Sequence, residues 1–184
     1  MKSGIFIVAE LTGDVRERVL EIQRWADPRL AAGTPPHITL VGSSGVGPMP
    51  IDTPVEELGE RLQAIGRTTA PIAVRFGAPH RFMQTDIIVL PIDPHGPLRT
   101  LHERLATSGL LFERPRFSFS PHVTLSFYQT LTPERERRLL SLRVGDPVVV
   151  DRIQCYLTLE PQPARRVLEV ALTGWAAARA EPLP

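Results

Sequence analysis

The sequence lacks several features that would point to common classes of protein. Cys155 is the only cysteine among 184 residues, so the chain cannot form an internal disulfide or a metal cage of several cysteines. No apolar run approaches the roughly 18 residues of a membrane span, and the stretch 5–9 is too short for a secretory signal. Lys2 is the only lysine, and a net charge of +1 argues against non-specific duplex binding. We therefore expect a soluble, cytoplasmic protein.

Apolar patterns predict an alternation of strands and helices along the chain. We expect strands at 5–11, 71–77, 86–92, 148–159 and 166–172, and helices at 14–26, from 54, from 97 and from 133 to about 142. Asp14 is expected to cap the first helix. Thr53 and Thr132 each precede a proline, a pattern typical of a capping threonine followed by a first-turn proline.

Two further strands carry a repeated element. Pro-His-Ile-Thr-Leu at 36–40 recurs as Pro-His-Val-Thr-Leu at 121–125. The histidines lie 85 positions apart and the two Thr-Pro pairs 79 apart, and this near-constant spacing indicates an internal duplication. We expect one bilobed domain over 1–174, with repeat units at roughly 4–84 and 85–173, and a C-terminal tail at 175–184.

The repeated element suggests a chemistry. Residues two apart on a strand point to the same face, so His37 stands beside Thr39, and His122 beside Thr124. Histidine has an ordinary pKa near 6.5, so one copy can serve as a base while the other serves as an acid. In-line displacement at phosphorus needs such a pair, and a threonine hydroxyl can stabilise the phosphate oxygens. This scheme requires no metal.

Other residues are weaker candidates for binding a substrate. Ser43, Ser126 and Tyr128 share strand parity with the nearby motif residues, which would bring them to the same cleft. Arg81 and Arg116 lie in loops that contain phenylalanines, and an aromatic ring beside an arginine can stack a base and hold a phosphate. Among the phenylalanines near Arg116, we select Phe119 as the candidate for stacking on a base. We interpret His80, His95 and His102 as structural, since they have no matched partners.

The two motifs His37-Ile38-Thr39-Leu40 and His122-Val123-Thr124-Leu125 resemble those of the 2H phosphoesterase superfamily, especially its bacterial 2'-5' RNA ligase-like, or LigT-like, branch. The resemblance implies an α+β fold: bilobed, internally duplicated, with two antiparallel sheets and helices packed outside around a central cleft. It implies hydrolysis of 2',3'-cyclic phosphates to 2'-phosphates, with weak reversible 2'-5' ligation in some relatives. It also implies that the two histidines and two threonines of the motifs are catalytic.

We assign His122 as the base that activates water and His37 as the acid that protonates the leaving 3'-oxygen. The expected partner is an RNA with a 2',3'-cyclic phosphate end or a small cyclic nucleotide, without cofactor, metal or membrane, bound by a monomer. Two alternatives stay open. The chain could be a non-catalytic protein that binds RNA ends or nucleotides, or a metal hydrolase that uses the histidines as ligands.

Overall fold

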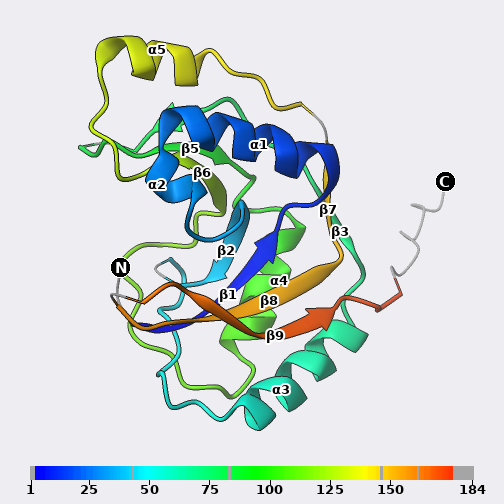
Figure 1. The fold of residues 1–184 in the computed structure, drawn as a ribbon. Helices are drawn as coiled ribbons and strands as arrows, with labels where there is room; N and C mark the ends of the chain where they lie inside the picture. The colour runs from blue at the N-terminus through cyan, green and yellow to red at the C-terminus, as the bar shows by residue number, and fades with distance from the viewer. Residues whose placement is uncertain (1–2, 43, 83, 146, 161, 176–184) are drawn as a thin grey trace, which may run out of the picture.

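The computed structural model describes residues 3–42, 44–82, 84–145, 147–160 and 162–175. Its strands are β1 Gly4–Glu10, β2 His37–Val41, β3 Ile72–Val74, β4 His80–Arg81, β5 Ile88–Pro91, β6 His122–Ser126, β7 Val148–Val150, β8 Arg152–Thr158 and β9 Arg165–Ala171. Its helices are α1 Gly13–Ala26, α2 Pro28–Ala31, α3 Val55–Arg67, α4 Pro97–Ala106 and α5 Pro133–Leu140. This composition confirms the α+β class (Figure 1).

Seven strands form one antiparallel sheet in the order β4-β5-β6-β2-β1-β8-β9, and β3 pairs with β7 in a small second sheet. The two motif strands, β2 and β6, are neighbours at the middle of the large sheet. Each expected helix, and each expected strand except 148–159, has a counterpart in the structure. The large sheet is continuous, because the β2–β6 pair joins the strands on either side of it.

The hydrophobic core lies on one side of the large sheet. Ile38 and Leu40 of β2 and Val123 and Leu125 of β6 are fully buried there. They belong to one apolar cluster with the inner faces of α1, α3 and α4. Because side chains alternate along a strand, the residues between these anchors point to the opposite side. We call that side the motif face, defined by His37, Thr39, His122 and Thr124.

The two halves of the chain exchange elements. Apart from α2 and β9, the first half runs β1-α1-β2-α3-β3-β4 and the second half has the same order, β5-α4-β6-α5-β7-β8. Strand β4 of the first half pairs with β5 of the second, and β8 of the second half pairs with β1 of the first. Helix α1 also contacts β6, while α4 contacts β2. No single cut therefore separates the halves into independent layers.

The helix starts differ in part from the sequence predictions. Asp14 is not the cap of α1; it lies in the first turn, after Thr12. Thr53 does not cap α3, because its hydroxyl donates instead to the carbonyl of Pro50 at 2.8 Å. Thr132 does cap α5, where its oxygen accepts from the backbone N–H of Arg135 at 3.2 Å. A threonine before a proline thus has two competing uses for its hydroxyl.

Three other expectations need correction. The segment 148–159 is not one strand but two, β7 and β8, with Asp151 between them. An apolar run shows neither where a strand bends nor that its two parts join different sheets. The stretch 27–36, where no helix was predicted, contains α2, whose first turn is capped by the Asp27 carboxylate at 3.1 Å from the N–H of Leu30. The short strand β4 was not predicted.

A bulge interrupts each motif strand after its threonine. The pairing of β1 with β2, and that of β5 with β6, shifts register by one residue. Such a bulge breaks the alternation of side chains. Leu40 and Val41 are consequently both buried, and so are Leu125 and Ser126. Strand parity therefore holds from histidine to threonine in each motif and fails beyond it.

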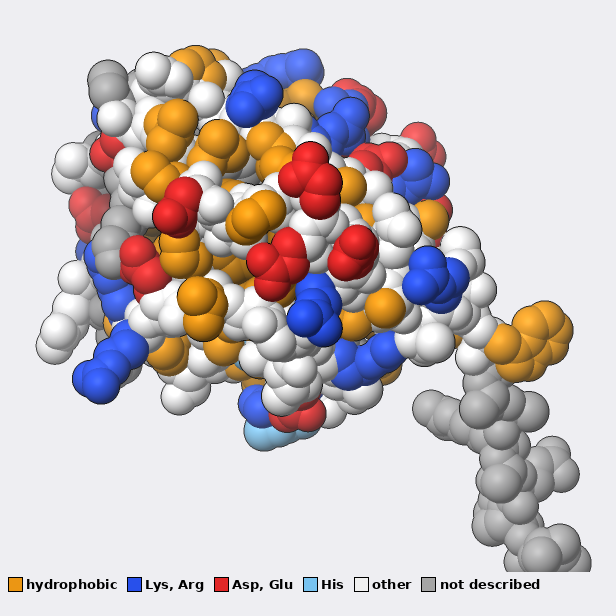
Figure 2. Space-filling view, turned by 90° about the horizontal axis from the view of Figure 1, so that it is seen from below, with side chains coloured by type: hydrophobic (Ala, Val, Ile, Leu, Met, Phe, Trp, Pro, Cys, Tyr) orange, Lys and Arg blue, Asp and Glu red, His pale blue; other side chains and the backbone are white. Residues whose placement is uncertain are grey.

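No helix within the described ranges is long and apolar enough to cross a membrane. The face seen from below in Figure 2 mixes hydrophobic, acidic and basic side chains. On that face the basic side chains are scattered among the acidic ones and do not gather into one patch.

Candidate active site

The register of the sheet brings the two motifs together. Ile38 of β2 pairs with Val123 of β6 in antiparallel register. Continuing this register by one residue places His37 opposite Thr124 and Thr39 opposite His122. Directly opposed side chains of an antiparallel pair lie about 4.5–5.5 Å apart at Cβ, and diagonal ones about 7–8 Å. The two histidines are thus diagonal neighbours, each with the other motif's threonine across from it.

Each motif histidine forms a hydrogen bond with the backbone carbonyl two residues before it. Nδ1 of His37 lies 2.7 Å from the carbonyl of Pro35, and Nδ1 of His122 lies 2.7 Å from the carbonyl of Ser120. A carbonyl only accepts hydrogen bonds, so Nδ1 carries the proton in each ring. When the ring is neutral, Nε2 is then the acceptor. Both rings are half-buried. In both motifs, Nε2 is therefore the ring nitrogen available for proton transfer.

The charges around the two histidines differ. Burial is the main cause that lowers the pKa of each ring, and the backbone hydrogen bond raises it in each case. The nearby Glu10 carboxylate further raises the pKa of His37. His37 and His80 both lower the pKa of His122. Neighbouring charges thus favour a protonated His37 and a neutral His122.

An aromatic ring contacts His122. The ring of Phe82 meets that of His122 edge-on, with centroids 5.0 Å apart, and His80 in turn contacts Phe82 at 5.6 Å. Near the first motif, the hydroxyl of Tyr156 of β8 donates to Glu10 Oε1 at 2.7 Å. An aromatic ring thus contacts His122 directly, whereas Tyr156 contacts Glu10, the partner of His37.

Two of the predicted substrate-binding residues are buried, and a third forms ion pairs at the surface. Ser126 is fully buried, because the bulge turns it away from the motif face. Phe119 is 6% exposed and stacks on His102 with ring centroids 3.9 Å apart, so it is a packing residue. Arg81 is already engaged, with ion pairs to Asp86 at 2.6 Å and Glu136 at 3.2 Å. Parity and composition were insufficient guides at these positions.

The other three predicted residues have different outcomes. Arg116 is exposed, and no hydrogen bond or ion pair joins it to another described residue. Tyr128 lies under the guanidinium of Arg29, which is 4.2 Å from the ring centroid, at the end of β6 next to α2. Ser43 lies outside the described residues. Of the six, Arg116 alone combines exposure with an unoccupied charged group in the described part of the chain.

Sequence reasoning passed over three residues near the motif face. Glu10 pairs with His37 across β1 and β2, yet from sequence it only closed an apolar run. Tyr156 lay inside a run interpreted as one buried strand. His80 was interpreted as structural. Only strand pairing reveals the importance of Glu10 and Tyr156.

Neither metal ligands nor hollows define this site. In the described ranges, no group of three or more His, Cys, Asp or Glu side chains could hold a metal ion. Two surface hollows, of about 450 and 490 Å³, lie at the β8–β9 turn and between α3 and α4. Neither hollow is lined by a motif residue, so the register of β2 and β6 is what defines the site.

Comparison with known proteins gives the family of this chain. Residues 12–161 match the model of the 2'-5' RNA ligase superfamily, and the chain belongs to this superfamily. The matched segment contains both motif strands.

Curated relatives are similar over part of the chain. A protein of Geobacillus kaustophilus, whose name provisionally assigns it to the phosphoesterases, is 36% identical over 93 residues. A similarly named protein of Geobacillus thermodenitrificans is 34% identical over 92 residues. Each alignment covers 50% of this chain and 50% of the relative, so the chain spans about half the length of the curated relatives it matches.

Solved structures share the fold over nearly the whole chain. The crystal structure of TT0787 of Thermus thermophilus has a TM-score of 0.65 at 21% identity, covering 92% of this chain and 98% of that one. E. coli LigT complexed with 3'-AMP has a TM-score of 0.57 at 18% identity, covering 93% and 98%. At these identities the likeness establishes the fold alone, and it confirms the predicted LigT-like architecture.

Proposed function

We propose that this protein is a phosphodiesterase that hydrolyses 2',3'-cyclic phosphates, at RNA ends or on small nucleotides, to 2'-phosphates. The proposal rests chiefly on one observation: Ile38 pairs with Val123, and this register, continued by one residue on either side, would set each half-buried motif histidine opposite the other motif's threonine. Membership of the 2'-5' RNA ligase superfamily supports it. The fold shared with LigT, whose structures include complexes with 3'-AMP, NADP+ and ATP, supports a nucleotide as the ligand.

The diagonal placement of the two histidines on β2 and β6 suits an in-line displacement at phosphorus. A phosphate placed between them would have the entering water at one Nε2 and the departing 3'-oxygen at the other, with hydrogen bonds of about 2.8 Å at each end. Thr39 and Thr124, on the other diagonal, would then donate to the two non-bridging oxygens. Hydrogen bonds to these oxygens strengthen as negative charge grows on them in the transition state.

The charges assign the two roles. His122, flanked by His37 and His80, is the base that takes a proton from water as the oxygen attacks phosphorus. His37, next to Glu10, is the acid that gives its proton to the 3'-oxygen as the P–O3' bond breaks. One bond to phosphorus forms and one breaks, and the product is a 2'-phosphomonoester with a free 3'-hydroxyl. The two histidines regain their starting states by proton exchange with solvent.

We propose further that residues 4–84 and 85–173 are repeats that form a single catalytic unit. Each repeat contributes one histidine and one threonine, and the exchange of strands between them fixes the two motifs in one sheet. A single repeat would hold only half of the acid–base pair. This proposal agrees with a chain in which neither half has its own layered core.

The test is incubation of the purified protein with 2',3'-cyclic AMP, with and without excess EDTA, followed by chromatographic separation of 2'-AMP from 3'-AMP. We expect 2'-AMP in both cases and a bell-shaped dependence of kcat/KM on pH. Substrate returned unchanged would identify a binding protein instead. Activity lost in EDTA and restored by a divalent metal would identify a metal hydrolase.

Variants connect the activity to the site. His37→Ala and His122→Ala should each lower turnover by about 10² to 10⁴, because each removes one proton transfer. The double variant should be little worse than the poorer single variant, since acid and base act in one step. His95→Ala is the matched control, because His95 is exposed and belongs to neither motif. Equal loss in His95→Ala would contradict the assignment.

A further inference from the structure

The two halves of the motif face match each other closely except beside the histidines. Val8 pairs with Thr39 on one side, and Val89 pairs with Thr124 on the other, so the threonines have the same neighbour. Glu10 pairs with His37, whereas the corresponding partner of His122 is Pro91. The duplicated site therefore carries a carboxylate next to one histidine and an uncharged ring next to the other.

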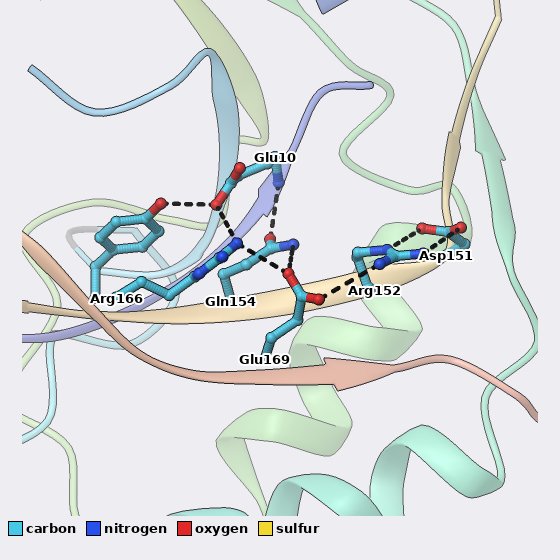
Figure 3. Close-up of polar contacts among 7 residues, drawn as sticks. Glu10, Asp151, Arg152, Gln154, Arg166 and Glu169 are labelled. Carbon is cyan, nitrogen blue, oxygen red and sulfur yellow. Dashed lines mark hydrogen bonds and ion pairs between the residues drawn. The ribbon is translucent and has the colours of Figure 1, made fainter. Parts of the chain in front are cut away.

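The Glu10 carboxylate is fixed by its surroundings. Its Oε1 accepts a hydrogen bond from the Tyr156 hydroxyl at 2.7 Å, and its backbone N–H donates to Gln154 Oε1 at 3.0 Å (Figure 3). Its side chain is only 16% exposed. A carboxylate that accepts from a hydroxyl and is largely shielded from water exerts its charge on near neighbours with little screening.

The nearby arginine does not cancel this charge. Arg166 Nη1 lies 3.6 Å from Glu10 Oε1 but 3.0 Å from Glu169 Oε2, so Arg166 is shared and is closer to Glu169. Gln154 donates to the same Glu169 oxygen at 3.1 Å. The Arg166 side chain is also half exposed, which weakens its electrostatic effect. Glu10 consequently keeps negative charge next to His37.

Around His122, the positions that correspond to Glu10, Gln154 and Tyr156 carry no acidic side chain. His80 pairs with Val89 on β4 and β5, as Gln154 pairs with Val8 on β8 and β1. His80 and the apolar ring of Phe82 thus occupy the place that Gln154 and Tyr156 occupy near His37. A second imidazole beside His122 disfavours a proton on it, which is the opposite of what Glu10 does.

We propose that Glu10 is a positioning residue that keeps the catalytic proton on His37, and that its absence from the second half makes His122 the base. This inference rests on the proposed function for its catalytic meaning. The groups facing His37 are Glu10 from β1, with Tyr156 and Arg166 behind it, and Thr124 and His122 from β6. Burial lowers the pKa of His37, and the Glu10 carboxylate acts against this effect.

The first test measures protonation without needing turnover. The chain has five histidines, so the imidazole signals in an NMR titration can be assigned with single His→Gln variants. In Glu10→Gln, the amide still accepts from the Tyr156 hydroxyl but carries no charge. We expect the His37 titration to move to lower pH while that of His122 stays in place. Tyr156→Phe is the matched control, since it breaks the same contact but leaves the carboxylate charged; it should not lower the His37 midpoint.

The second test measures the pH dependence of kcat/KM on 2',3'-cyclic AMP. Since the acid must be protonated, the alkaline limb of the bell follows His37, and Glu10→Gln should move that limb to lower pH. The acid limb, which follows His122, should not move. Glu10→Asp should restore the alkaline limb in part. A merely structural role of Glu10 would lower activity equally at all pH values.

The outcomes separate the two proposals. An unchanged His37 titration in Glu10→Gln overturns the role of Glu10, whatever the activity. A wild-type protein without activity on cyclic nucleotides overturns the proposed function, while the NMR titration still decides whether Glu10 sets the charge of His37. A shift of both histidines by the same amount also overturns the inference, because it would show a general change of the site.

Discussion

Removing the Asp27 carboxylate should strongly destabilise the protein. Asp27 follows α1 and is fully buried. One of its oxygens accepts from the N–H of Leu30 at 3.1 Å, and the other accepts from Phe127 at 2.7 Å and Tyr128 at 2.6 Å. The carboxylate therefore ties α2 to the segment that leaves the second motif strand. Asp27→Ala breaks all three hydrogen bonds at once.

The magnitude follows from those contacts. A hydrogen bond to a charged group contributes about 1.5–3 kcal/mol, and water can partly replace the lost acceptor at groups that are only part-buried. We therefore expect Asp27→Ala to lower the free energy of unfolding by roughly 3–5 kcal/mol, a large fraction of the 5–15 kcal/mol typical of a folded domain. Asp27→Asn keeps one acceptor oxygen and should lose about half as much.

Urea unfolding followed by tryptophan fluorescence measures this effect, since Trp25 lies in α1. Asp14→Ala is the matched control: Asp14 is exposed in the first turn of the same helix, so its loss should cost less than about 1 kcal/mol. The reasoning fails if Asp27→Ala unfolds within about 1 kcal/mol of the wild-type protein, or no more easily than the Asp14 control.

Three further predictions can be checked on similar preparations. Leu40→Ala or Leu125→Ala should lower the free energy of unfolding in urea by roughly 2–5 kcal/mol, since both side chains are fully buried. A smaller loss would contradict the placement of these leucines in the core. Burial lowers the pKa of His102. The contribution of His102 to stability is therefore complete above its ordinary pKa of 6.5 and is lost as pH falls. We expect His102→Gln to flatten the decline of the urea midpoint below pH 6.5. Ser126→Ala removes a buried hydroxyl that has no hydrogen-bond partner among the described residues, so neither stability nor turnover should fall.

Local patterns of the sequence were sufficient to predict much of the fold. The helix predicted from 97 is present as α4, with Leu98, Leu101 and Leu105 buried at helical spacing. The alternation that sets His37 beside Thr39 and His122 beside Thr124 is matched by the burial of Ile38 and Val123 between them. These predictions succeeded because each depends on a few neighbouring residues whose periodicity is not interrupted.

Features that depend on strand pairing could not be predicted. The bulge after Thr124 results from the fit of β6 against β5, so parity wrongly brought Ser126 to the motif face. Glu10 gains its importance only from its partner His37 on the neighbouring strand. Phe119 looked like a base-stacking ring, but His102, which also donates to the carbonyl of Leu40 at 2.7 Å, covers it from α4. Such contacts join segments distant in sequence.

The pairing of β1 with β8 also has a consequence for biosynthesis. On the ribosome, β1 is made long before β8, the strand that covers its outer edge. An uncovered strand edge readily pairs with other chains. Contacts between distant segments also slow folding, because a long loop must close before they form. The free edge of β1 therefore remains open to aggregation until β8 has been made, and holding chaperones should raise the yield of this chain more than they would for a protein with local strand pairs.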